Sequence, residues 1–118
     1  MRFVKQVVLN VSVVVLGSVV DYGAHLMSPL FSVPPHYLPN KIMVGSLIVV
    51  VAFYLGRRFI RAPDRLALFV CAVVAILLQI RYFLEGYNLF FVLSFLFLHF
   101  LMFLLPAHLI YRKYSQLI

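Results

Sequence analysis

The residues with the clearest chemical potential in this sequence are ionisable and amide side chains placed among apolar neighbours. Asp21 and His25 are four positions apart, so on a helix they lie on one face, about one turn from each other. His99 stands in the middle of a long apolar run, residues 86–111. Such groups are costly inside a membrane and often mark sites of binding or proton transfer. The sequence therefore predicts a ligand- or ion-binding site made by Asn10, Asp21, His25, Gln79, Arg81 and His99.

The partner of Asp21 is open at this stage. Arg81 is expected at a similar depth and His25 lies one turn away, so either side chain could pair with the carboxylate. Glu85, however, is four residues after Arg81 and could bind it instead. Asp21 would then be a proton- or cation-binding carboxylate and not one half of an ion pair that sets the helix register. His99 likewise suits either a hydrogen bond between helices or a proton relay.

Metal binding and catalysis are the next alternatives. Asp21, His25, His36 and Glu85 are residue types that bind zinc, but they lack the paired-ligand spacing of a known metal motif. A nucleophile motif, a phosphate-binding glycine loop and an HExxH pair are also missing. We therefore expect no metal, no cofactor and no enzymatic activity.

The composition determines which elements can position these side chains. Of the 118 residues, 65% are hydrophobic and only 11% are charged, whereas soluble domains carry about 25% charged residues. A chain this short cannot bury so much apolar surface in a core of its own, so the lipid bilayer must solvate the excess. The net charge of +7 comes mainly from basic residues that flank apolar runs, which is typical of membrane topology and not of nucleic-acid binding. The expected fold class is an all-α, multi-pass integral membrane protein.

Four transmembrane helices are predicted, because charged residues divide the apolar sequence into four runs. With neutral or long-stemmed neighbours included, they cover residues of about 3–25, 38–59, 64–83 and 87–110, close to the roughly 20 residues that a bilayer requires. Together they form one membrane domain, residues 1–118, as a four-helix bundle. The outer loop at 28–40 is rich in proline and apolar residues, which favours a stiff segment that lies in the interface or folds back as a lid. Asp64 is expected as the N-cap of the third helix.

The basic residues predict the orientation. Eight of the ten Lys and Arg residues precede the first helix, follow the fourth, or lie between the second and the third. Positive residues favour the cytoplasmic side, so both termini are predicted to be cytoplasmic. The cluster between the second and third helices is expected to contact anionic lipid headgroups through Arg57, Arg58, Arg61 and Arg65.

The helix surfaces indicate which faces turn inward. Along the first helix, polar and small side chains follow one stripe, and lipid cannot satisfy their hydrogen bonds, so this face should meet other helices. The stripe consists of Gln6, Asn10, Gly17, Ser18, Asp21 and His25. In the second helix, the small residues Gly45, Ala52 and Gly56 favour close packing, either within one chain or between copies.

Two functions remain open from the sequence. The first is binding or transport of an ion or small polar solute by the outer polar residues, in a homo-oligomer because four helices hardly enclose a pathway. The second is a non-catalytic accessory or assembly subunit, or a lipid-contacting scaffold, of a larger membrane complex. Neutralising Asp21 should matter most under the first hypothesis, whereas disrupting Ala52 and Gly56 should matter most under the second.

Overall fold

The computed structural model describes residues 1–27, 29 and 32–118. Its four α-helices are α1 (Arg2–Leu26), α2 (Tyr37–Gly56), α3 (Pro63–Leu84) and α4 (Leu89–Lys113), and a short 3-10 turn, η2 (Ser115–Leu117), follows α4. All four α-helices are long and apolar enough to cross a membrane. The prediction of an all-helical chain with four such helices is therefore confirmed for the described residues.

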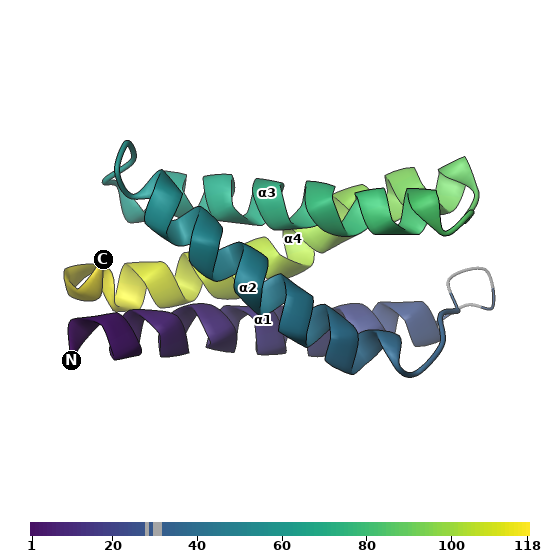
Figure 1. Cartoon of the computed structure of the whole chain (residues 1–118), viewed down its shortest axis with the longest axis horizontal. Helices are drawn as coiled ribbons and strands as arrows, with labels where there is room; N and C mark the ends of the chain where they lie inside the picture. Colours follow the sequence, from purple (N-terminus) through teal and green to yellow (C-terminus); the bar gives the residue numbers. More distant parts are fainter. Residues whose placement is uncertain (28, 30–31) are drawn as a thin grey trace.

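The helices pack as a ring in which α1 contacts α2 and α4, and α3 contacts the same two neighbours. The bundle is 42 Å long, and the N- and C-termini lie at one end together with the connection between α2 and α3 (Figure 1). We call this the basic end. It carries Arg2, Lys5, Arg57, Arg58, Arg61, Arg65, Arg112 and Lys113. The opposite end, which we call the far end, holds the other two connections and the two remaining basic residues.

The helix boundaries differ from their predicted positions by one to three residues. Helix α2 begins at Tyr37 and includes Pro39 in its first turn, where a proline is tolerated because its missing N–H would have no partner within the helix. The same helix ends three residues early, at Gly56, and α4 continues three residues further, to Lys113. Because α2 begins at Tyr37, the loop predicted at 28–40 is shorter. Its residues Ser28, Leu30 and Phe31, on which the lid prediction depends, lie outside the described residues.

Local sequence explains how α3 and α4 begin. The prediction that Asp64 is an N-cap is wrong: Ala62 is the N-cap, Pro63 is the first helical residue and Asp64 lies in the first turn. A carboxylate there is still favourable, because the helix dipole is positive at this end. Helix α4 has a side-chain cap, since the Asn88 side chain accepts a hydrogen bond from the backbone N–H of Phe91 at 2.8 Å. The turn before it uses Gly86 with a φ of 88°, a conformation that favours glycine.

The small residues of the predicted packing seams make their contacts within one chain. A Cβ atom added at Gly17 would lie 2.5 Å from the Phe103 ring, and one at Gly56 would lie 2.6 Å from the Phe69 ring. These glycines therefore let α1 approach α4 and let α2 approach α3 more closely than a larger residue would.

Candidate functional site

The polar stripe of α1 faces the inside of the bundle, as the sequence predicted. Gln6, Asn10, Ser18, Asp21 and His25 are all buried. Near the far end, three other helices add polar side chains to this stripe: Lys41 from α2, Gln79 from α3 and His99 from α4. We call the group made by Asp21, His25, Lys41, Gln79 and His99 the Asp21 cluster.

Lys41 occupies the centre of the Asp21 cluster. Its ammonium group donates a hydrogen bond to Oδ2 of Asp21, and it lies 3.0 Å from Nε2 of His99 and 3.4 Å from Nε2 of His25. The exposed fraction is 0% for Asp21 and His99, 2% for His25 and 5% for Lys41. The cluster is therefore a buried ion pair in which one carboxylate and two imidazole nitrogens surround one cation.

Gln79 determines which nitrogen of His99 carries the proton. The amide Nε2 of Gln79 donates to the backbone carbonyl of Val92 at 2.6 Å, so its Oε1 is the atom that faces His99. This oxygen lies 2.6 Å from Nδ1 of His99, and an oxygen there can only accept. Nδ1 of His99 is therefore the donor, and a neutral ring has its lone pair on Nε2, facing Lys41 and Asp21.

Two buried oxygen atoms on α1 have no hydrogen-bond partner among the described residues. They are Oγ of Ser18 and Oδ1 of Asp21. Oδ1 of Asp21 lies 3.0 Å from Nε2 of His99, where two lone pairs meet if His99 is neutral. Unpartnered polar atoms are rare inside proteins and require a physical explanation. Oδ1 of Asp21 leaves acceptor capacity on the carboxylate that binds the Lys41 ammonium.

Aromatic rings form one wall of the Asp21 cluster. The ring of Phe95 stacks on that of His25 with centroids 4.1 Å apart and planes at 2°. The ring of Tyr82 stacks on that of His99 at 5.8 Å, and its centroid lies 5.4 Å from Nζ of Lys41. These faces fix the two imidazole planes and provide a cation–π contact, so the cluster is preorganised around a positive charge.

Arg81 does not pair with any residue of the Asp21 cluster in the described part of the chain. Its Nε binds Oε1 of Glu85 at 3.0 Å, and the hydroxyl of Tyr37 donates to the other carboxylate oxygen of Glu85. The hydrogen bond from Tyr37 lowers the pKa of Glu85, and Arg81 adds to this effect. The Asp21–Arg81 pair, one of the alternatives that the sequence left open, does not form, because Arg81 binds Glu85, the C-cap of α3, and Lys41 reaches Asp21 instead.

Asn10 belongs to a second buried polar group, nearer the basic end. Its Nδ2 donates to the backbone carbonyl of Gln6 at 2.8 Å, and its Oδ1 accepts from the hydroxyl of Tyr111. Gln6 in turn accepts from the Tyr54 hydroxyl at 2.8 Å and donates to the backbone carbonyl of Leu117. We call this set the Asn10 cluster. It contains no charged side chain.

The structure thus brings together four of the six predicted site residues and adds Lys41, which sequence reasoning assigned only to membrane topology. A signal for Lys41 was present, because it lies one turn before Gly45 on the face of α2 that is buried. His36 and Glu85, considered for a metal site with Asp21 and His25, do not join the cluster. Glu85 pairs with Arg81, and His36 is the N-cap of α2, with its ring against that of Tyr37.

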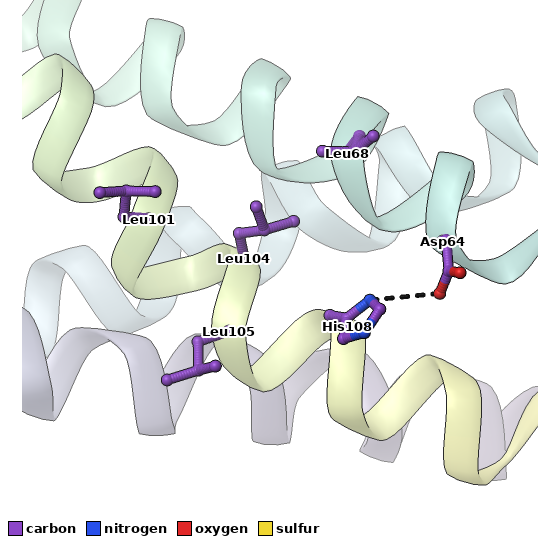
Figure 2. A pocket seen from close by; sticks show the side chains of 6 residues that line it. All are labelled: Asp64, Leu68, Leu101, Leu104, Leu105 and His108. Atoms are coloured by element: carbon purple, nitrogen blue, oxygen red, sulfur yellow. Dashed lines mark ion pairs between the residues drawn. The ribbon is translucent and has the colours of Figure 1, made fainter.

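A separate apolar groove lies between α3 and α4 toward the basic end (Figure 2). Its volume is about 540 Å³, and its walls are aliphatic: Leu68, Leu101, Leu104 and Leu105. Asp64 and His108 close one end with an ion pair of 3.2 Å, and both side chains are partly exposed. A surface of this kind suits an acyl chain or an apolar side chain.

Comparisons with family models, with curated proteins and with solved structures find no match to this chain. The function has to be argued from the geometry of the two buried clusters and of the groove.

Proposed function

We propose that this protein is a multi-pass membrane protein with both termini on the cytoplasmic side, and that it binds a small cation at the Asp21 cluster. Four helices of sufficient length and apolarity support insertion in a membrane. The gathering of eight of the ten Lys and Arg residues at the basic end supports the orientation. In this orientation the Asp21 cluster belongs to the outer half of the bundle.

The observation that carries the proposal is the placement of Lys41 beside one carboxylate oxygen and two imidazole nitrogens. A carboxylate and two imidazoles, contributed by α1 and α4, converge on one cationic group. A buried ion pair is no efficient source of stability, because desolvating both charges offsets most of their attraction. Its presence within apolar helices therefore favours a role in recognising positive charge.

The size of the ligand follows from burial. None of these four charged or imidazole residues exposes more than 5% of its surface, so a polar solute with a bulky body has no access to them. A cation that fits in the position of an ammonium group does not need a larger cavity. Transport of such a cation across the membrane would require a pathway that four helices hardly enclose, and so a homo-oligomer.

The test is thermal unfolding of the full chain in a mild detergent with the chlorides of Na⁺, K⁺, Mg²⁺, Ca²⁺ and Zn²⁺ at constant ionic strength. A ligand that binds only the folded state stabilises it by about 2.7 kcal/mol at 100 times its Kd. We expect at least one cation to raise the melting temperature of the wild type and of Asp64→Asn, but not of Asp21→Asn. Asp64 is the matched control, because it is a carboxylate exposed near the basic end.

Asp21→Asn leaves the Lys41 ammonium buried without its counter-charge, which lowers stability by itself. The double variant Asp21→Asn/Lys41→Met removes both charges and serves as the folded comparison. The proposal fails if this double variant responds to the cations as the wild type does, or if none of the five cations changes the wild-type melting temperature.

The second candidate function, an accessory subunit or lipid-contacting scaffold, is favoured by the groove of Figure 2. Its aliphatic walls would accept a lipid chain or an apolar residue of a partner helix. Under this alternative, Leu104→Asn should release a lipid or a protein that co-purifies with the wild type, while Asp21→Asn/Lys41→Met should not. Retention of the same lipids and proteins by Leu104→Asn would exclude it.

A further inference from the structure

The three atoms around the Lys41 ammonium form a set of metal ligands. Oδ2 of Asp21 and the Nε2 atoms of His25 and His99 each face Nζ of Lys41. One ligand atom from each of these three residues lies within 4.8 Å of the other two. Two histidines and one carboxylate are a common ligand set for divalent transition metals, and three protein ligands leave a further position open.

We propose that the Asp21 cluster is a three-ligand site for a divalent transition metal of the zinc class, and that the Lys41 ammonium occupies the metal position until a metal displaces it. This inference rests on the proposed function and names the cation that the cluster recognises. The protein ligands are Asp21, His25 and His99.

The distances from the two imidazole nitrogens to the Asp21 carboxylate are close to those of tetrahedral coordination. Zinc bonds of about 2.0–2.1 Å at tetrahedral angles separate neighbouring ligand atoms by about 3.3 Å. Nε2 of His25 lies 3.3 Å from Oδ2 of Asp21, whereas Nε2 of His99 lies 3.0 Å from Oδ1, the other oxygen of the same carboxylate. A metal bound through one of these oxygens would therefore require the carboxylate to turn or the His99 ring to shift.

The surroundings of His99 match those of a metal-binding histidine. Such a residue donates its second N–H to a carbonyl or carboxylate, which fixes the tautomer and orients the ring. Gln79 accepts this proton from Nδ1 and is held by the Val92 carbonyl. The Nε2 lone pair is consequently available to a metal. Oδ1 of Asp21 and Oγ of Ser18, which lack partners among the described residues, add acceptor capacity on the same face of α1.

Displacement of Lys41 requires no unfolding. Lys41 lies in the second turn of α2, next to the far end of the bundle. A lysine stem of four methylene groups can lie along apolar surface while the ammonium reaches the membrane interface. Metal binding would then replace the Lys41 ammonium by a metal ion, and the site would hold a positive charge in both states.

The test is metal binding by Lys41→Met, which removes the competing cation and preserves an apolar stem of similar length. Zn²⁺ affinity is measured on the purified full chain by competition with a chromophoric chelator. We expect Lys41→Met to bind one Zn²⁺ at least tenfold more tightly than the wild type. Zn²⁺ should also raise the melting temperature of Lys41→Met by more than that of the wild type, because it replaces the lost counter-charge of Asp21.

Two further substitutions in the Lys41→Met background locate the metal. His99→Gln should reduce Zn²⁺ affinity at least tenfold. His108→Gln removes the histidine that pairs with Asp64 near the basic end and should leave the affinity within twofold. Survival of tight binding in the His99→Gln variant would place the metal elsewhere and overturn the inference.

Wild-type protein makes the test independent of how well Lys41→Met folds. Excess Co²⁺ should give the intense visible absorption of tetrahedral cobalt in the wild type and not in His99→Gln. The metal inference is overturned if these bands are absent from the wild type and Lys41→Met binds no Zn²⁺. The proposed function survives this result if another cation stabilises the protein through Asp21. If no cation does so, the proposed function fails as well.

Discussion

The Asp21 cluster and the Asn10 cluster lie on the same polar stripe of α1, and both are buried, yet they satisfy their polar atoms in different ways. In the Asn10 cluster, amides, hydroxyls and backbone carbonyls match donor to acceptor, as in the bond from Tyr54 to Gln6. In the Asp21 cluster, one carboxylate and two imidazoles converge on one ammonium, and Oδ1 of Asp21 has no hydrogen-bond partner among the described residues. The first arrangement is complete without a ligand, whereas the second is organised around a cation that can be replaced.

The energetic consequences of the two arrangements differ. Removing one partner of a buried ion pair leaves an uncompensated charge, which costs about 3–5 kcal/mol. Removing one partner of a neutral hydrogen bond costs about 1 kcal/mol, and polar contacts between membrane helices have similar values. Substitutions in the two clusters should therefore differ in how much unfolding free energy they cost and in whether a second substitution restores stability.

The largest expected effect belongs to the single variants of the ion pair. We expect Asp21→Asn or Lys41→Met alone to lower the free energy of unfolding by about 3–5 kcal/mol, because each leaves a buried charge unpaired. The double variant should recover most of this loss. Equilibrium unfolding in mixed detergent micelles measures all three. If the single variants cost no more than the double variant, the two charges do not interact as the structure indicates.

The next effect concerns Gln79, which supports His99 without touching the cation. Gln79→Leu removes the acceptor of the Nδ1 proton, and loss of such a partner typically reduces metal affinity 10–100-fold. We expect this reduction in Zn²⁺ competition assays in the Lys41→Met background. Gln79→Glu, which retains an acceptor oxygen, should restore most of the affinity. Equal affinity for Gln79→Leu and its parent would mean that the His99 tautomer does not depend on Gln79.

A smaller effect is expected in the Asn10 cluster. Tyr111→Phe deletes the hydroxyl that donates to Oδ1 of Asn10 and should cost about 1 kcal/mol of unfolding free energy. Cation binding should be unchanged, because the cluster contains no charge. The same micelle unfolding assay and the cation panel provide both readings. A change in cation response would show that the two clusters are coupled through α1.

The smallest effect belongs to the Arg81–Glu85 pair at the far end. Both side chains are about one-third exposed, and pairs of this kind contribute about 0–1 kcal/mol. Glu85→Gln should therefore reduce stability only slightly. Because the pKa of Glu85 is lowered in the folded state, its contribution is present above the ordinary glutamate range and is lost as the pH falls through the lowered pKa. The melting temperatures of the wild type and of Glu85→Gln, compared across acidic pH, test whether the stabilising contribution of Glu85 disappears as the pH falls.

The sequence predicted the helices and the inward stripe because both depend on local patterns. Apolar runs divided by charges define four helices, and the spacing of Gln6, Asn10, Asp21 and His25 places them on one face. The partner of Asp21 could not be obtained in this way. The sequence offered Arg81 and His25 as candidates, and only the packing of α2 against α1 brings Lys41 to Asp21. The tautomer of His99 depends on a contact with Gln79 from another helix and is equally non-local.

The polar stripe of α1 also has a consequence for how the protein is made. Translation produces α1 before α4, and two partners of the stripe lie far along the chain: Tyr111 is 101 residues after Asn10, and Leu117 is 111 residues after Gln6. If the helices insert in a membrane as proposed, lipid cannot satisfy the polar groups of the stripe while α4 is missing. The four-helix ring closes only when α4 takes its place against α1.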